Sequence, residues 1–241
     1  MLGVLEFSRG AVVSALACEV ASLARVLSVL TEGEAGLPTR CAPWDVAALA
    51  LHTVGALERV LVMLDVEAMD TGDRLVSASD YYVPDARFSP EVDAERVRRA
   101  VEMAARWKGP AGPGRMLSRW WAELSARLPV EPVDRVVRTR HGDPMLLTDF
   151  LVTRVVELGV HGLDLADALR REPWLTDEAS EVVVQLLFGG AEHAVLERLL
   201  PGVWSEAGAD VDAIRVVTGR TVQEVDRAVL EAAGVRFLTL G

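Results

Sequence analysis

The sequence predicts a mainly α protein, built as a helical bundle followed by a small, mostly helical C-terminal region. Apolar residues recur every three to four positions through most of the chain, which is the period of an amphipathic helix. Capping residues and proline or glycine breaks separate these stretches. With 241 residues, of which 51% are hydrophobic and 25% charged, the chain can bury a sizeable core as one large domain or as a main and a smaller domain.

Five helices are expected in the first part of the chain. Ser8 is the expected cap of the first helix and Asp45 the expected cap of the second. Pro90, directly after Ser89, suits the first position of the third. Asp143 or Thr148 starts the last and longest helix. The predicted ranges are 9–30, 45–65, 89–107, 115–128 and 148–171.

Between these helices lie two features with open interpretations. Residues 71–88 include Tyr81 and Tyr82 and form either a functional lid over the open end of the bundle or a plain connector. Trp120 and Trp121 are adjacent, so they cannot share one helix face. One is expected in the core and the other against a cleft or a partner, which leaves a monomer or a homodimer open.

The C-terminal part is also expected to be helical. Thr176 caps its first helix, and Thr221 with Glu224 forms a capping box for its last. The predicted helices span 177–200, 210–218 and 221–233. The domain prediction is a metal-binding helical bundle over 1–172 and a small region over 173–241.

Composition and charge exclude several classes of protein. The net charge is −11 and no basic cluster is present, which argues against a nucleic-acid partner. Cys18 and Cys41 are too few for a disulfide scaffold and suit a reducing cytosol. No signal peptide and no apolar run of membrane-spanning length is expected, because charged residues interrupt the apolar stretches. The predicted protein is soluble and cytoplasmic, with no membrane partner.

The stretch LVTRVVELGVHGLDLADAL, residues 151–169, carries the chemistry. Glu157 and His161 are four residues apart and therefore lie on one helix face, inside the apolar stripe. A buried carboxylate needs a partner to offset its lost hydration, and a metal ion would supply one. The alternative is a partly exposed Glu–His pair of little energetic consequence.

His52 is the only polar ring in the apolar stretch of the second helix. A lone histidine there is more often a hydrogen-bonded core residue than a ligand. Together, however, His52, Glu157 and His161 make the set of two imidazoles and one carboxylate that binds catalytic zinc and leaves a position open. Iron, nickel or manganese would also be accepted. Cys41 is a poor candidate ligand, because its spacing from His52 matches no zinc knuckle.

These two stretches carry a resemblance to a known family. TRCAPWDVAALALHTV (39–54) and TRVVELGVHGLDLADAL (153–169) resemble the mycothiol-dependent maleylpyruvate isomerase family, which belongs to the DinB-like metal-dependent helical bundles. The resemblance covers the organisation of residues 8–170 and implies a DinB-like four-helix bundle. It also implies a divalent metal, usually zinc, on His52, Glu157 and His161, and mycothiol as the thiol cosubstrate.

The resemblance implies an enzyme in which a metal-bound thiolate attacks a small electrophilic substrate. Addition to a conjugated double bond, rotation and elimination would give isomerisation, whereas addition or displacement alone would be S-transfer. Two alternatives remain: a metal-dependent hydrolase that uses bound water, and a non-catalytic DinB-like binding protein. Of the 25 basic residues only Lys108 is lysine, an arginine bias that fits the GC-rich actinobacteria, which make mycothiol.

Three further residues are candidates for supporting roles. ADVDAIRVVTGR (209–220) is similar to a segment of the family's C-terminal domain in which an arginine assists substrate or thiol binding, so Arg220 is the matching position; it would alternatively cap its own helix. The region 173–241 is then a reduced form of that domain. Arg154 would bind a substrate carboxylate or clamp a ligand, and Asp164 would orient an imidazole. Both alternatively form surface ion pairs.

Overall fold

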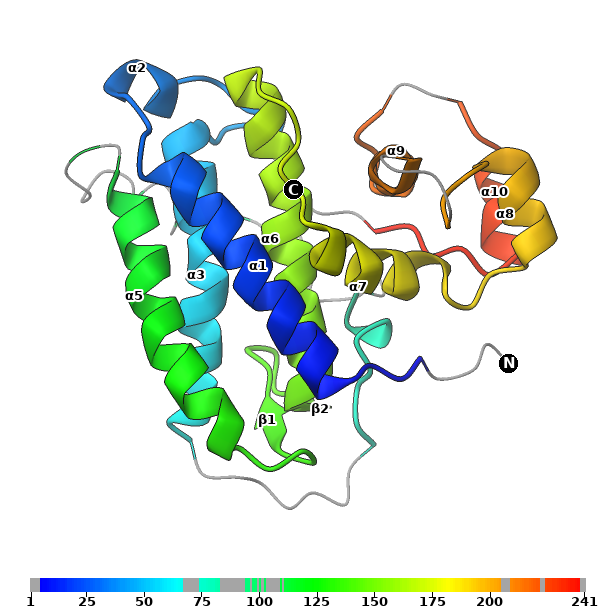
Figure 1. Ribbon diagram of the computed structural model, residues 1–241, viewed down its shortest axis with the longest axis horizontal. Helices are drawn as coiled ribbons and strands as arrows, with labels where there is room; N and C mark the ends of the chain where they lie inside the picture. Colours follow the sequence, from blue (N-terminus) through cyan, green and yellow to red (C-terminus); the bar gives the residue numbers. More distant parts are fainter. Residues whose placement is uncertain are drawn as a thin grey trace.

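Four long helices form a bundle in the computed structural model (Figure 1), which confirms the predicted mainly α fold. The structure describes residues 5–66, 74–82, 111–204, 209–221 and 224–238, with isolated positions between 94 and 109. Helices α1 and α3 each pack against both α5 and α6. The bundle helices are α1 (Arg9–Leu27), α3 (Val46–Leu64), α5 (Gly112–Arg127) and α6 (Leu147–Leu169).

Helix α6 is the centre of the molecule. It packs against α1 and α3 and also against the first helix of the C-terminal region, so residues around its whole circumference are buried. The helix begins at Leu147 without a side-chain cap, so neither Asp143 nor Thr148 caps it. Its last turn ends at Arg170, which adopts a left-handed conformation with φ of 54°. Most polar side chains in the middle of α6, among them Thr153, Arg154, His161 and Asp164, are therefore buried in the protein interior.

The caps of the other bundle helices follow the sequence in part. Asp45 accepts a hydrogen bond from the backbone of Ala48 at 2.8 Å and caps α3 as predicted. Ser8 occupies the N-cap position of α1, but its side chain makes no capping bond. A short helix, α2 (Glu32–Ala35), lies in the connector between α1 and α3 and carries a capping box formed by Thr31 and Glu34.

A small antiparallel hairpin precedes α6. Strands β1 (Val136–Arg138) and β2 (Pro144–Leu146) pair in register Val137 to Met145, and a 3-10 turn, η3 (Leu128–Val130), links α5 to this region. The described end of the predicted loop, residues 74–82, contains a second 3-10 turn, η1 (Asp80–Tyr82). Its Val76 bridges to Met145, so this part of the loop is attached to the hairpin.

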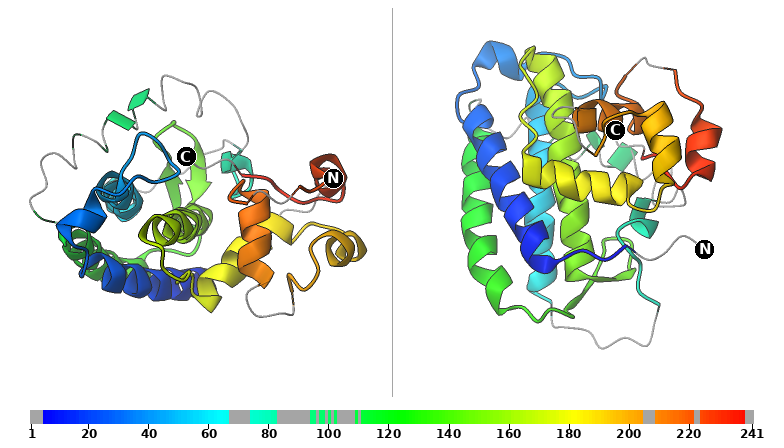
Figure 2. Two further views of the ribbon diagram at one scale, coloured as in Figure 1. Left: turned by 90° about the horizontal axis from the view of Figure 1, so that it is seen from above. Right: turned by 45° about the vertical axis from the view of Figure 1, so that its right-hand side comes forward.

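The C-terminal region packs on the bundle through α7, which contacts α1 and α6 (Figure 2). No strand occurs in the described part of residues 173–241. The helix predicted over 177–200 is interrupted at Gly189 and Gly190, where the glycine pair predicts a bend, and is divided there into two helices. The helices are α7 (Asp177–Phe188), α8 (His193–Leu199), α9 (Ala209–Val217) and α10 (Arg227–Ala232).

Two further local predictions need correction or lie outside the described residues. The capping box of Thr221 and Glu224 is wrong, because the last helix begins later and Asp226 caps it by accepting from the backbone of Val229 at 3.1 Å. Thr176 caps α7 as predicted. The helix predicted over 89–107 and most of the loop over 71–88 fall outside the described residues.

Helices α1 and α3 are both long and apolar enough to cross a membrane by length and composition. As the sequence predicts, charged residues interrupt the apolar run of each helix: Glu19 and Arg25 in α1, Glu58 and Arg59 in α3. In the most apolar window of each helix, 44% and 67% of the residues are buried against the rest of the protein. Trp120 and Trp121, on α5, are both partly buried against the core, and the contact of one of them with a cleft or a partner stays a prediction.

Candidate metal centre

The bundle brings the three predicted ligands together. Nε2 of His52, on α3, lies 3.7 Å from Oε2 of Glu157 on α6. Nε2 of His161, one turn later on α6, lies 3.5 Å from the same oxygen. All three donor atoms lie within 4.8 Å of one another. The i,i+4 spacing stacks the pair on α6, and the packing of α3 on α6 supplies the third residue.

This spacing fits a single metal ion. Two donors that bind one tetrahedral zinc at about 2.0–2.2 Å lie about 3.3–3.6 Å apart. The separations of 3.5 and 3.7 Å agree with that requirement and are long for direct hydrogen bonds. Two imidazoles and one carboxylate leave a fourth tetrahedral position for a water molecule or a substrate atom. The donor set therefore fits a catalytic rather than a structural zinc site.

The electrostatics of the three residues also suit a cation. Burial would raise the pKa of Glu157, but His161, His52 and Arg154 outweigh burial and hold that pKa well below its ordinary value. Burial would lower the pKa of His161, but its polar neighbours, first Asp164 and then Cys41 and Glu157, raise it to about 10. In the metal-free protein a proton on His161 supplies the positive charge that an ion on the same atoms would replace.

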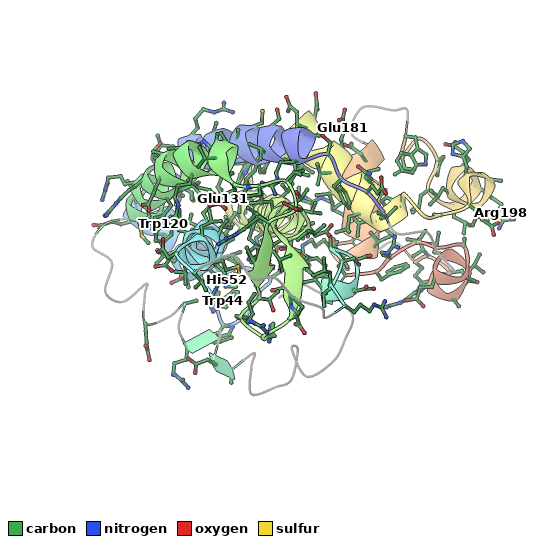
Figure 3. All side chains as sticks on the ribbon, turned by 90° about the horizontal axis from the view of Figure 1, so that it is seen from below. Trp44, His52, Trp120, Glu131, Glu181 and Arg198 are labelled. Carbon is green, nitrogen blue, oxygen red and sulfur yellow. The ribbon has the colours of Figure 1, made fainter. Side chains whose placement is uncertain are left out.

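An aromatic ring fixes the orientation of His52. The rings of Trp44 and His52 lie with their centroids 4.5 Å apart at an interplanar angle of 31° (Figure 3). The rings of His52 and His161 meet edge to face at 5.2 Å. Trp44 is buried and directly precedes Asp45, the cap of α3. Its ring therefore packs on the imidazole of His52 from the segment that leads into this helix. Sequence reasoning assigned no role to Trp44, although it belongs to the motif that carries the family resemblance.

Asp164 supports the centre from behind His161. Its Oδ2 lies 3.0 Å from Nδ1 of His161, so it orients the ring with Nε2 toward Glu157. The same oxygen accepts a hydrogen bond from Nη2 of Arg220 at 2.7 Å. Burial would raise the pKa of Asp164, but His161 and Arg220 lower it to about 2. Asp164 is buried, so the alternative of a surface ion pair is wrong.

Cys41 is a neighbour that sequence spacing did not reveal. Its Sγ lies 3.4 Å from Oδ2 of Asp164, and the thiol, His161 and Asp164 form a second group of possible metal donors. Arg220 and Arg40 both face Asp164, the latter at 3.7 Å from Oδ1. Two guanidinium groups repel a second cation. Cys41 is therefore better described as a hydrogen-bond donor to the aspartate.

Arg154 lies near the carboxylate of Glu157, inside a group of aromatic rings. Its guanidinium carbon lies 4.4 Å from the ring centroid of Phe150 and 6.0 Å from that of Tyr81. Its Nε and Nη2 donate to the hydroxyl of Thr153 at 3.0 and 2.9 Å. The side chain is buried, which excludes a surface ion pair. Within the part of the chain that the structure describes, no carboxylate lies within ion-pair distance of it.

Tyr82 connects the loop before the hairpin to this region. Its hydroxyl donates to the carbonyl of Thr153 at 3.2 Å, and its ring packs edge to face against Tyr81. Burial raises the pKa of Tyr82 well above its ordinary value, and the charge of Glu157 adds to that increase. The end of the loop therefore packs beside the part of α6 that carries Glu157, which fits both a lid and a plain connector.

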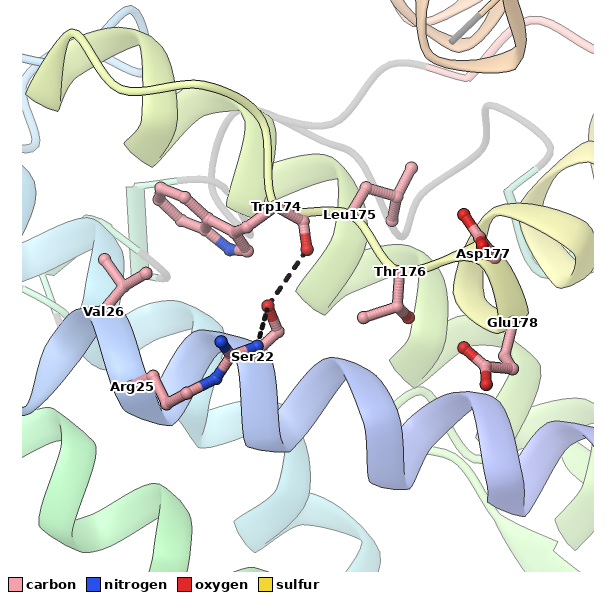
Figure 4. Close-up of a pocket in the computed structure, with 8 residues that line it drawn as sticks. All are labelled: Ser22, Arg25, Val26, Trp174, Leu175, Thr176, Asp177 and Glu178. Carbon is pink, nitrogen blue, oxygen red and sulfur yellow. Dashed lines mark hydrogen bonds between the residues drawn. The ribbon is translucent and has the colours of Figure 1, made fainter. Parts of the chain in front are cut away.

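An open pocket of about 470 Å³ lies elsewhere, between α1 and the segment that leads into α7 (Figure 4). Ser22 and Arg25 line it from α1, and Trp174 and Thr176 line it from the segment. The hydroxyl of Ser22 donates to the carbonyl of Trp174 at 3.1 Å. No candidate ligand lines this pocket.

The sequence matches a known family over most of the bundle. The family model described as "Mycothiol maleylpyruvate isomerase N-terminal domain" matches residues 16–166. Two solved structures, of a mycothiol-dependent maleylpyruvate isomerase and of a mutant of it, each show 15% identity and a TM-score of 0.47; the alignment covers 74% of this chain and 68% of theirs. No curated protein sequence matches. The family model spans more than half of the sequence and includes all three candidate ligands, and the chain belongs to the mycothiol-dependent maleylpyruvate isomerase family.

Proposed function

We propose that this protein is a zinc-dependent enzyme that uses mycothiol to transform a small electrophilic substrate, by isomerisation or by S-transfer. The observation that carries the proposal is the convergence of His52, Glu157 and His161 at separations suited to one tetrahedral ion. Membership of a mycothiol-dependent family supports the choice of thiol and of reaction class.

Each residue of the centre has a role in this proposal. His52, Glu157 and His161 would hold the ion. When bound, the ion would lower the pKa of a coordinated thiol and so make the thiolate available near neutral pH. Trp44 orients the imidazole of His52 through the ring contact, and Asp164 orients that of His161 through the hydrogen bond described above.

Arg154 is the residue that we assign to the substrate. Its guanidinium is buried, is oriented by Thr153 and two aromatic rings, and has no carboxylate partner among the described residues. A buried cation of this kind suits a carboxylate, which it can bind through two parallel hydrogen bonds. The proposed substrate is therefore a small carboxylic acid that carries an electrophilic double bond or leaving group.

The isomerisation can be written without any net consumption of thiol. The sulfur adds to one end of a conjugated cis double bond, and the electron pair moves toward the conjugated carbonyl. Rotation about the resulting single bond follows, and elimination of the thiol restores the double bond in the trans form. S-transfer would stop after addition or displacement. The family name favours the isomerisation.

Elemental analysis and thiol-dependent turnover test the proposal together. We expect about one zinc per chain in the purified protein, loss of zinc in His52→Ala, and no change in His193→Ala. His193 is a matched control because it lies exposed on α8. Turnover of maleylpyruvate should require mycothiol. Wild-type protein without metal, prepared without chelators, would refute the metal centre. Activity without thiol would instead favour the hydrolase alternative, and bound metal without any turnover the binding-protein alternative.

We also propose a cytoplasmic location. Cys18 and Cys41 are both free thiols, as expected for a reducing compartment.

A further inference from the structure

We infer that Arg220 is a positioning residue: it acts through Asp164 to fix the imidazole of His161, so that the C-terminal region completes the metal centre without touching substrate. This inference rests on the proposed metal site. It differs from the role that the family resemblance implies for Arg220, which is direct assistance in substrate or thiol binding.

The contacts of Arg220 form a continuous chain to the ligand. Its Nη2 donates to Oδ2 of Asp164 at 2.7 Å, and that oxygen lies 3.0 Å from Nδ1 of His161. Nη1 of Arg220 donates to the carbonyl of Thr218 at 2.7 Å. The side chains of Arg220 and Asp164 are both 0% exposed. Two of its N–H groups are therefore used inside the protein, and the buried guanidinium is held against Asp164 and Thr218.

The effect on His161 follows from the geometry of the ring. The Asp164 carboxylate, as hydrogen-bond acceptor at Nδ1, keeps a proton on that nitrogen. The other ring nitrogen, Nε2, faces Glu157 and is then the atom that would bind the metal. The carboxylate of Asp164 can hold the ring only if its own position is fixed. Arg220 fixes it by one short ion pair anchored on Thr218, just beyond the end of α9. Loss of such outer partners typically weakens metal binding without removing a ligand.

A neighbouring ion pair provides a matched control. Arg215 on α9 binds Asp167 on α6 with two hydrogen bonds of 2.7 Å each. Arg220 lies just beyond the end of α9, so both pairs link this part of the C-terminal region to α6, but the Arg215–Asp167 pair is partly exposed to solvent, with Asp167 44% exposed. Replacing Arg215 therefore weakens the docking of α9 on α6 without removing the hydrogen bond to Asp164.

The test compares Arg220→Gln, Arg220→Lys and Arg215→Gln in the full chain. Zinc affinity is measured by competition with a chromogenic chelator, and the ligand geometry by the visible absorption of the cobalt-substituted protein. We expect Arg220→Gln to weaken zinc binding roughly 10–100-fold and to alter the cobalt spectrum. Arg220→Lys should restore part of the affinity. Arg215→Gln should leave both readouts near wild type.

Three outcomes would overturn the inference. Unchanged zinc affinity in folded Arg220→Gln would show that Asp164 needs no arginine. Equal losses in Arg220→Gln and Arg215→Gln would show that only docking of the C-terminal region matters. A wild-type protein that binds no zinc would refute the proposed function together with this inference. The first two outcomes, in contrast, would refute only the role of Arg220. If Arg220→Gln does not fold, Arg220→Lys supports the same comparison, because it keeps the charge and loses the guanidinium geometry.

Discussion

Replacement of Glu19 by glutamine should change the pH dependence of stability. Glu19 lies on α1 and is fully buried. Its Oε2 accepts hydrogen bonds from the backbone N–H and the hydroxyl of Thr176, at 3.0 and 3.1 Å, in the segment that leads into α7. Its Oε1 has no hydrogen-bond partner in the part of the protein that the structure describes. Burial raises the pKa of Glu19 to about 7, although the Thr176 bonds favour the charged form.

The sign of the effect follows from this raised pKa. The folded protein holds the Glu19 proton more tightly than the unfolded chain, whose carboxyl titrates near its ordinary value of 4.5. The contribution of this proton to stability is therefore complete below about pH 4.5 and is lost as pH rises to about 7. At 1.36 kcal/mol for each pKa unit, the loss is at most about 3 kcal/mol. Glutamine carries no charge, and its oxygen can still accept both bonds from Thr176.

Urea unfolding followed by circular dichroism measures this difference. At about pH 8 Glu19→Gln should be more stable than wild type by about 1–3 kcal/mol, and near pH 4.5 the two should agree closely. Thr176→Val serves as a control for the loss of one hydrogen bond and of the α7 cap, because it keeps a titratable carboxyl at position 19. A pH-independent difference between Glu19→Gln and wild type would refute the reasoning.

Three further substitutions test the packing and the substrate site. Gly114→Ala should lower stability in thermal melts by about 1–3 kcal/mol, because the new methyl group would lie 2.9 Å from the backbone nitrogen of Ser28. Gly55→Ala is the control: it has open space around it and should be neutral or slightly stabilising. Leu151→Ala should cost about 2–5 kcal/mol in urea unfolding, since this side chain is fully buried on α6, and a loss below 1 kcal/mol would contradict its place in the core. Arg154→Lys should raise the KM for a carboxylate substrate about tenfold with zinc content unchanged, and an unchanged KM would remove Arg154 from the substrate site.

Local sequence patterns predicted the parts of the site that lie on one helix. Glu157, His161 and Asp164 are three to four residues apart on α6, so a helical prediction is enough to place them side by side. His52 comes from α3, and its arrival beside them is a matter of tertiary packing. The family resemblance supplied that association, which periodicity alone does not give.

The errors and omissions have a common physical cause, which is that tertiary contacts override local signals. Cys41 and Arg220 reach Asp164 from distant segments, and no spacing rule joins them. Thr221 and Glu224 have the pattern of a capping box, but Asp226 lies immediately before the helix and provides the cap instead. Interior helices such as α3 also reach the hydropathy of a membrane span, because they are covered on several sides by other helices.

The distribution of the donors along the chain has a consequence for the order of assembly. Glu157 and His161 become neighbours as soon as α6 forms, whereas His52 joins them only after a chain segment of about a hundred residues has closed. In the proposed metal centre, a chain with α6 formed and the bundle still open would present only two donors, which copper and nickel also bind readily. The closed bundle would add the third donor. Discrimination between metals would thus come from the packing of α3 on α6 and not from the i,i+4 pair alone.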